Sequence, residues 1–186
     1  MEDGALRVRQ LARSGPLLVC RCGRRYPILD GIPVVLSDLS GWAASEGPSA
    51  LRRRDLPAPI TELLAVDVAS RRNQRLGQVY AALPPSPFCA WLASAIAEAS
   101  GPVLEVGSGI GHPQSVRLDL NFSLLRESGP VAGPIDTPEG AALGAGSAVV
   151  ADAADPPFLA GSFATVVLAN VLDSCAQPAI VLAQAD

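Results

Sequence analysis

Short apolar runs separated by helical or turn-like patterns dominate the second half of the chain. The runs span residues 103–106, 116–120, 148–151 and 163–169, and the first is rich in β-branched residues. Continuous apolar runs of this length are typical of strands buried on both faces, as in a parallel sheet covered by helices. The pattern therefore predicts an α/β fold with a parallel sheet of about four strands within residues 101–186.

The first 39 residues show a different pattern, in which short strands are joined by tight turns. Strand-like runs cover residues 17–20, 25–28 and 32–36. The dipeptide Asp30-Gly31 between the last two runs is a strong turn signal. We therefore expect residues 1–39 to form a small β module.

The middle of the chain is expected to hold a linker and then helices. Residues 40–57 are rich in Gly, Ser, Pro and Arg, which indicates a linker. Residues 58–100 show apolar positions at helical spacing, interrupted by prolines at 84–87. Ser86 and Pro87 suit the cap and the first residue of a second helix.

Further helices are expected between and after the later strands. Asn121 is positioned to cap a short helix over residues 122–127, and Pro178 to begin another helix. Residues 128–147 are rich in Gly, Pro and Ala and are expected to be irregular.

The charges are divided unevenly along the chain. Residues 1–100 hold twelve arginines and nine acids, whereas residues 101–186 hold two arginines and nine acids, a net charge of −7 within a total of −4. Such an acidic second part does not favour nucleic acid. The chain contains no lysine, which excludes a Schiff base or a Walker-type phosphate site.

Neither membrane association nor disulfide pairing is indicated. No apolar stretch is long enough to span a membrane and no secretory signal is visible, so we expect no membrane partner and a cytoplasmic location. The cysteines show no framework of pairs and are expected to be free thiols. They are Cys20, Cys22, Cys89 and Cys175.

The apolar run at 103–106 leads into a loop with glycine at alternate positions, Gly107, Gly109 and Gly111. Glycine is needed where the backbone has positive φ or approaches another group closely. Loops of this kind after the first strand of an open α/β sheet hold nucleotide-like ligands. Asp119 follows where a carboxylate that binds ribose hydroxyls is expected.

Residues 101–186 resemble the N-terminal half of class I S-adenosylmethionine-dependent methyltransferases, which implies a partial Rossmann-like sheet. Residues 103–111 look like that family's first motif, in which the glycine loop packs against the amino-acid part of the cofactor. The strand acid Glu105 then orients the cofactor, or serves instead as a hydrogen-bonding residue behind the loop. Asp119 matches the ribose-binding acid, and Asp152 matches the acid that accepts from the adenine amino group. The positions implied to bind S-adenosyl-L-methionine are Glu105, Gly107, Ser108, Gly109, Gly111, Asp119, Asp152 and Ala153.

The function implied by this resemblance is methyl transfer from S-adenosyl-L-methionine to an acceptor. The acceptor is open between tRNA, a protein and a small molecule. The residues identify no catalytic base: His112 follows the glycine loop, but an incidental loop position is the other interpretation. Asn170 and Asp173 lie in the segment that faces the substrate in that family.

Residues 18–36 resemble half of the small zinc-ribbon-like proteins that activate tRNA and protein methyltransferases. The distinctive part is Tyr26-Pro27-Ile28 followed by Asp30-Gly31-Ile32-Pro33. A zinc site needs four ligands, usually in Cys-x-x-Cys pairs. Because Cys20 and Cys22 are one residue apart and no second pair precedes them, we expect no metal site.

Two features depart from a complete enzyme of the methyltransferase family. Only residues 112–115 separate the glycine loop from the next strand, whereas a crossover between parallel strands needs a dozen or more residues, usually a helix. Either the two strands are not parallel neighbours, or the cofactor site is degraded. The family's sheet also continues beyond its fourth strand, and an unfinished sheet leaves an apolar edge for a protein partner or for self-association. The alternative function is therefore a catalytically inactive binding or activator module.

Overall fold

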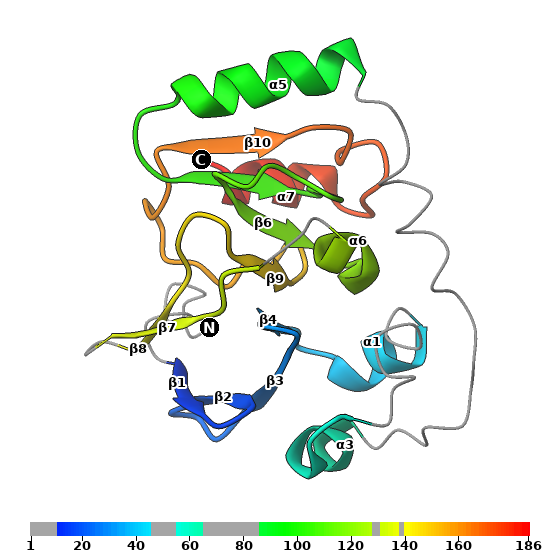
Figure 1. The fold of residues 1–186 in the computed structure, drawn as a ribbon. Coiled ribbons are helices and arrows are strands. Elements are labelled where there is room, and N and C mark those ends of the chain that lie inside the picture. The colour runs from blue at the N-terminus through cyan, green and yellow to red at the C-terminus, as the bar shows by residue number, and fades with distance from the viewer. Residues whose placement is uncertain (1–10, 46–54, 65–85, 128–130, 138–139) are drawn as a thin grey trace.

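The computed structural model describes residues 11–45, 55–64, 86–127, 131–137 and 140–186. An antiparallel sheet formed by the N-terminal residues lies next to a four-stranded parallel sheet (Figure 1). The mixture of helices with a parallel sheet confirms the expected α/β class. Part of the helical pattern expected before residue 84 lies outside the described residues. Every described helix is too short or too polar to cross a membrane.

The parallel sheet contains the four strands that the apolar runs predicted. They are β5 (Val103–Val106), β6 (Val116–Asp119), β9 (Ala148–Val150) and β10 (Thr165–Leu168). The strands lie in the order β10-β5-β6-β9, and every neighbouring pair is parallel. The chain moves from β5 outwards through β6 to β9 and then returns to the other side of β5. This reversal makes the carboxyl ends of β5 and β10 a switch point in the strand order.

No helix connects β5 to β6, although the two strands are parallel neighbours. Leu104 pairs with Val116, and Val106 pairs with Leu118. Residues 107–115 form turns between the strands. The possibility that the strands are not neighbours is therefore excluded. One face of the sheet is crossed here by a loop where a crossover helix is usual.

The opposite face of the parallel sheet is apolar. Alternate residues of a strand point to the same face, and those of β5 and β6 pack here with Val149 of β9 and Val181 of helix α7 (Pro178–Gln184). The residues from β5 and β6 are Leu104, Val106, Val116 and Leu118. Helix α7 begins at Pro178, as predicted.

The N-terminal sheet contains the expected strands and one more. Its strands β1 (Leu11–Ser14), β2 (Leu17–Cys20), β3 (Arg25–Leu29) and β4 (Ile32–Pro33) pair antiparallel in chain order. Asp30 and Gly31 have φ of +50° and +83°. Positive φ at both central residues is what a type I′ hairpin turn requires, so the predicted turn is confirmed.

The N-terminal sheet joins the parallel sheet at β9. Val34 forms a parallel bridge with Val150, and the Val35 N–H donates a hydrogen bond to the Val150 carbonyl at 2.8 Å. Ile32 from one sheet and Ala148 from the other belong to the same cluster of buried apolar residues. The two sheets therefore share a core.

Residues 39–45 form helix α1 (Leu39–Ser45), where the composition had indicated a linker. The Asp38 carboxylate accepts the Gly41 N–H at 2.8 Å, which caps the helix. Trp42 is buried, and its indole N–H donates to the Leu120 carbonyl at 3.1 Å. One aromatic anchor thus holds a segment whose other residues are mostly small or polar. Helix α3 (Ala58–Leu64) packs into the same core.

The segment 128–147 was expected to be irregular, and this prediction is wrong for part of it. β7 (Ile135–Thr137) and β8 (Gly140–Ala142) pair antiparallel, separate from both larger sheets. Gly and Ala have weak strand preferences, so composition alone did not indicate this hairpin.

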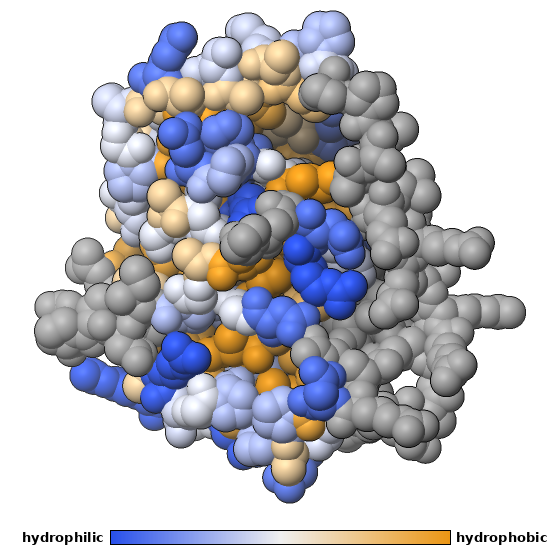
Figure 2. Space-filling model, in the orientation of Figure 1, coloured by the Kyte–Doolittle hydropathy of each residue, from blue (hydrophilic) through white to orange (hydrophobic). Residues whose placement is uncertain are grey.

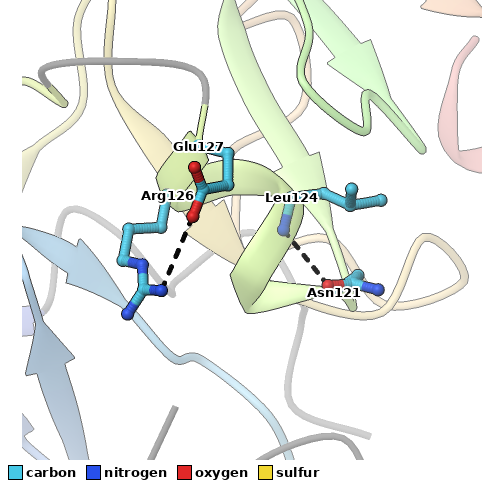
Figure 3. Close-up of polar contacts among 4 residues, drawn as sticks. All are labelled: Asn121, Leu124, Arg126 and Glu127. Atoms are coloured by element: carbon cyan, nitrogen blue, oxygen red, sulfur yellow. Dashed lines mark hydrogen bonds and ion pairs between the residues drawn. The ribbon is translucent and has the colours of Figure 1, made fainter. Parts of the chain in front are cut away.

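Helix α6 (Phe122–Glu127) begins where the sequence predicted. The Asn121 side-chain carbonyl accepts the Leu124 N–H at 3.2 Å and caps the helix (Figure 3). An ion pair between Arg126 and Glu127, at 3.6 Å, is drawn in the same view. Because this pair is partly exposed, it adds little stability.

Helix α5 (Pro87–Glu98) has the predicted cap, since the Ser86 hydroxyl accepts the Cys89 N–H at 3.2 Å. α5 lies beside β10, the outermost strand of the parallel sheet (Figure 1). Phe88 and Trp91 on α5 are 45% and 63% exposed. Figure 2 shows a mixture of hydrophilic and moderately apolar residues at the top of the molecule, where α5 lies.

Candidate functional site

The parallel strands bring the residues predicted for cofactor binding to one edge of the sheet. Gly107 directly follows β5, Asp119 ends β6, and Asp152 comes two residues after β9. Because the strands are parallel, these residues share an edge with the loop after β10. That loop holds Asn170, which has a φ of +54°, and the exposed Asp173.

The three glycines of the loop have backbone conformations that favour glycine. Gly107, Gly109 and Gly111 have φ of +62°, +56° and +62°. A Cβ at Gly107 would lie 2.6 Å from Cγ2 of Val171, and a Cβ at Gly111 would lie 2.7 Å from Cδ of Arg117. Two of the glycines therefore make room for the protein's own side chains. Gly109 differs, because a Cβ there would meet a single side-chain atom, at 3.9 Å.

Asp119 is half-buried and binds the glycine loop directly. Its Oδ2 accepts the Gly109 N–H at 2.7 Å, and its Oδ1 accepts the Asn121 N–H at 2.8 Å. The predicted ribose-binding acid and the middle glycine are thus in contact. A carboxylate has about four lone-pair sites, so each oxygen can accept a further hydrogen bond.

Glu105 is buried beneath the loop. Its Oε2 accepts the His112 N–H at 2.7 Å and the Ser115 hydroxyl. The sequence left two roles open for Glu105, namely orienting the cofactor or forming hydrogen bonds behind the loop. These contacts match the second role. The His112 ring is also engaged within the loop, because its Nδ1 accepts the Gln114 N–H at 3.3 Å.

Arg117 lies beneath the same loop, at the position of β6 that pairs with Glu105 of β5. It is 1% exposed, and its guanidinium donates to the carbonyls of Ile110, at 3.3 Å, and Gly146, at 3.0 Å. Burial lowers the pKa of the guanidinium, and the Glu105 carboxylate raises it. Sequence reasoning missed this residue. The available signal was one charged residue inside each of two consecutive apolar strands.

The remaining predicted positions make fewer contacts. Asp152 is exposed, and its Oδ1 accepts the Ala154 N–H at 2.9 Å. Ala153 is half-buried. The Ser108 N–H donates to the Leu118 carbonyl at 3.2 Å, which ties the loop to β6. The Ser108 hydroxyl oxygen is buried and has no hydrogen-bond partner within the described part of the chain.

Metal ligands do not gather in the described residues. No group of three or more His, Cys, Asp or Glu side chains among them could hold a metal ion. The four cysteines are free: Cys20 at the end of β2, Cys22 in the turn that follows, Cys89 on α5, and Cys175 in the loop after β10.

Comparisons of the chain with protein-family models, curated proteins and solved structures found no match. What the chain does is therefore inferred from the geometry of the sheet edge and from the residues that occupy it.

Proposed function

We propose that the chain binds S-adenosyl-L-methionine at the carboxyl edge of the parallel sheet and transfers its methyl group to an acceptor. The strand order supports this proposal. A first strand with a glycine loop, two further strands on one side and the fourth on the other is the order of a Rossmann-like sheet. Ligands bind such sheets outside the carboxyl ends of the strands, at the switch point.

The observation that carries the choice of cofactor is the contact between Gly109 of the glycine loop and the Asp119 carboxylate. Dinucleotides place their pyrophosphate on the N-terminus of the helix after such a loop. Residues 107–115 lead through turns directly into β6. The absence of that helix counts against a dinucleotide, and it equally favours the second candidate function described below. The net charge of −7 over residues 101–186 also favours a cationic cofactor over a polyanion.

The residues at this edge fit the adenosine half of the cofactor. Asp119 has an acceptor site left on each oxygen, which suits the two ribose hydroxyls. The exposed Asp152 carboxylate can accept from the adenine amino group. Gly109 is the loop position with space beside it.

S-adenosylmethionine, when bound, supplies an electrophilic methyl group on a cationic sulfur. The chain's own contribution is to hold the ribose through Asp119 and to place an acceptor beside the loop that contains Asn170 and Asp173. Catalysis of such a transfer rests on positioning and on the exclusion of water.

Calorimetric titration of S-adenosylhomocysteine into the purified chain tests the proposal, with adenosine as a second ligand. We expect binding that is about tenfold weaker in Asp119→Asn, because a charge-assisted hydrogen bond is lost. Glu98→Gln, on the exposed surface of α5, is the matched control and should bind as the parent does. Thermal melting of each variant checks folding. Absence of binding at millimolar ligand would overturn the proposal, and formation of S-adenosylhomocysteine from the cofactor with candidate acceptors tests the transfer.

A second candidate function, the catalytically inactive binding or activator module, is favoured by the packing of the loop. Val171 fills the space beside Gly107, and Arg117 fills the space beside Gly111, where the resemblance implies the amino-acid end of the cofactor. This module would bind adenosine as tightly as S-adenosylhomocysteine, or bind neither, and would produce no methyl transfer. The two ligands of the titration therefore separate the candidates.

A further inference from the structure

Two cysteines lie on a tight turn between β2 and β3. Cys20 is the last residue of β2 and is half-buried, whereas Cys22 lies in the turn and is exposed. The Gly23 N–H donates to the Cys20 carbonyl at 2.9 Å, and the Cys20 N–H donates to the Arg24 carbonyl at 2.8 Å. These backbone bonds fix the turn and hold the two cysteines close together.

The backbone of one cysteine contacts the sulfur of the other. The Cys22 N–H donates to Sγ of Cys20 at 3.3 Å. The turn therefore holds the Cys20 sulfur beside the backbone of Cys22.

The two thiols also differ in acidity. The neighbouring Cys20 side chain lowers the pKa of Cys22, and the Arg24 backbone and charge lower it further. The neighbouring Cys22 side chain raises the pKa of Cys20, and burial adds to this. Cys22 is thus the more ionised sulfur and the more exposed one, as expected for an attacking thiolate.

We propose that Cys20 and Cys22 form a dithiol site that exchanges with anionic, low-molecular-weight disulfides. The Cys22 thiolate attacks one sulfur of the disulfide, whose S–S bond breaks, and the released thiolate takes up a proton. Cys20 then loses its proton and attacks the Cys22 sulfur, which releases the second thiol and leaves a Cys20–Cys22 disulfide. Two electrons and two protons pass from the cysteine pair to the disulfide, which becomes two thiols.

The residues around Cys20 and Cys22 explain why the proposed substrate is an anionic disulfide. Arg21, Arg24 and Arg25 are exposed on the same short segment. Their positive charge attracts an anionic disulfide and stabilises the thiolate. Because a single residue separates the cysteines, the internal disulfide closes a small, strained ring. Strained and exposed disulfides are readily reduced, so a Cys20–Cys22 disulfide would take part in exchange and would not be a stable structural cross-link.

Glutathione disulfide and cystamine, an anionic and a cationic disulfide, are the probes for this site. They are added to the full chain carrying Cys89→Ser and Cys175→Ser, and intact-mass spectrometry follows the products. In the chain that keeps both cysteines, we expect glutathione disulfide to produce a Cys20–Cys22 disulfide without attached glutathione. The Cys20→Ser variant should accumulate a mixed disulfide between Cys22 and glutathione, and the Cys22→Ser variant should react with glutathione disulfide about tenfold more slowly. Glutathione disulfide should react faster than cystamine at low salt, and the difference should shrink at high salt.

Cys89 provides the matched comparison because it is also an exposed thiol. A chain that retains only Cys89 should react more slowly than one that retains only Cys22, and circular dichroism checks that each variant folds. The rate of alkylation against pH should place the Cys22 midpoint below that of an ordinary thiol, and Cys20→Ser should move it upwards. Persistent glutathione on the chain with both cysteines, equal rates for Cys22 and Cys89, or equal rates for the two disulfides would overturn the proposal.

Discussion

Glu105 and Arg117 pair across neighbouring parallel strands, and both are almost fully buried, at 5% and 1% exposure. Both side chains form hydrogen bonds with the loop that covers them. The Glu105 carboxylate accepts from the His112 N–H and the Ser115 hydroxyl, and the Arg117 guanidinium donates to the Ile110 carbonyl. A crossover helix satisfies its own backbone and covers a sheet by apolar packing. Here Glu105 and Arg117 instead provide hydrogen-bond partners for polar groups of the loop. Buried backbone N–H and C=O groups require such partners.

Arg117→Met should lower the free energy of unfolding by about 3–5 kcal/mol, because it leaves the Ile110 and Gly146 carbonyls without their guanidinium donor and removes the positive charge opposite the buried Glu105 carboxylate. The double variant Glu105→Gln/Arg117→Met should lose less than the sum of the two single variants. Urea unfolding followed by circular dichroism measures all three. Strictly additive losses would show that the two residues are not coupled.

Gly111→Ala should destabilise the fold by roughly 2–4 kcal/mol, because it combines a positive φ with overpacking. At this position φ is +62° and a Cβ would lie 2.7 Å from Cδ of Arg117. Gly161→Ala is the control, since its φ is +71° but a Cβ there meets nothing within 4 Å. Gly161→Ala should lower the free energy of unfolding by about 1 kcal/mol, which is the cost of the positive φ without overpacking. Equal losses in thermal unfolding would contradict the contact with Arg117.

The strands and caps could be predicted from local sequence, whereas their long-range partners could not. The apolar runs identified 103–106 and 116–120 as strands, and the position of Asn121 before a helical pattern identified a cap. The pairing of the two strands was not predicted, because the short connection counted against a parallel pair. The charged residues that make such a connection possible become neighbours only in the folded sheet.

The candidate site was also predictable in part. The order of the motifs placed Asp119 near the glycine loop, and the contact with Gly109 agrees with this. Alternate glycines indicate that something approaches the backbone closely, but they do not say what approaches. The close neighbours of Gly107 and Gly111 are Val171 and Arg117, and neither could be identified from spacing.

Trp42→Phe should destabilise the protein by about 1–2 kcal/mol, because it leaves the Leu120 carbonyl without its indole donor. Trp91→Phe should change stability by less than about 0.5 kcal/mol, since Trp91 is 63% exposed. In the Trp91→Phe chain the fluorescence of Trp42 should be blue-shifted and should shift red together with global unfolding. A separate, earlier transition would show that α1 is not part of the common core.

Self-association through β10 is expected, because Thr165–Leu168 form the outermost strand of the sheet and contain no charged residue. Sedimentation velocity over a range of concentrations should show reversible association. Thr165→Lys should weaken it, since lysine on an edge strand opposes pairing. Ala58→Lys on α3 adds the same charge at an exposed position elsewhere and should leave it unchanged. Equal behaviour of the two variants would exclude the β10 edge.

The bridge between Val34 and Val150 sets a constraint on folding during synthesis. The N-terminal sheet leaves the ribosome first, but Ile32 and Val34, each 0% exposed in the finished fold, bury themselves together with Ala148 and Val150. Domains that fold as independent units can do so while the rest of the chain is still being made. Here Ile32 and Val34 cannot be buried until Ala148 and Val150 have been synthesised. We therefore expect a nascent chain that stalls before residue 148 to leave these two side chains exposed to chaperones.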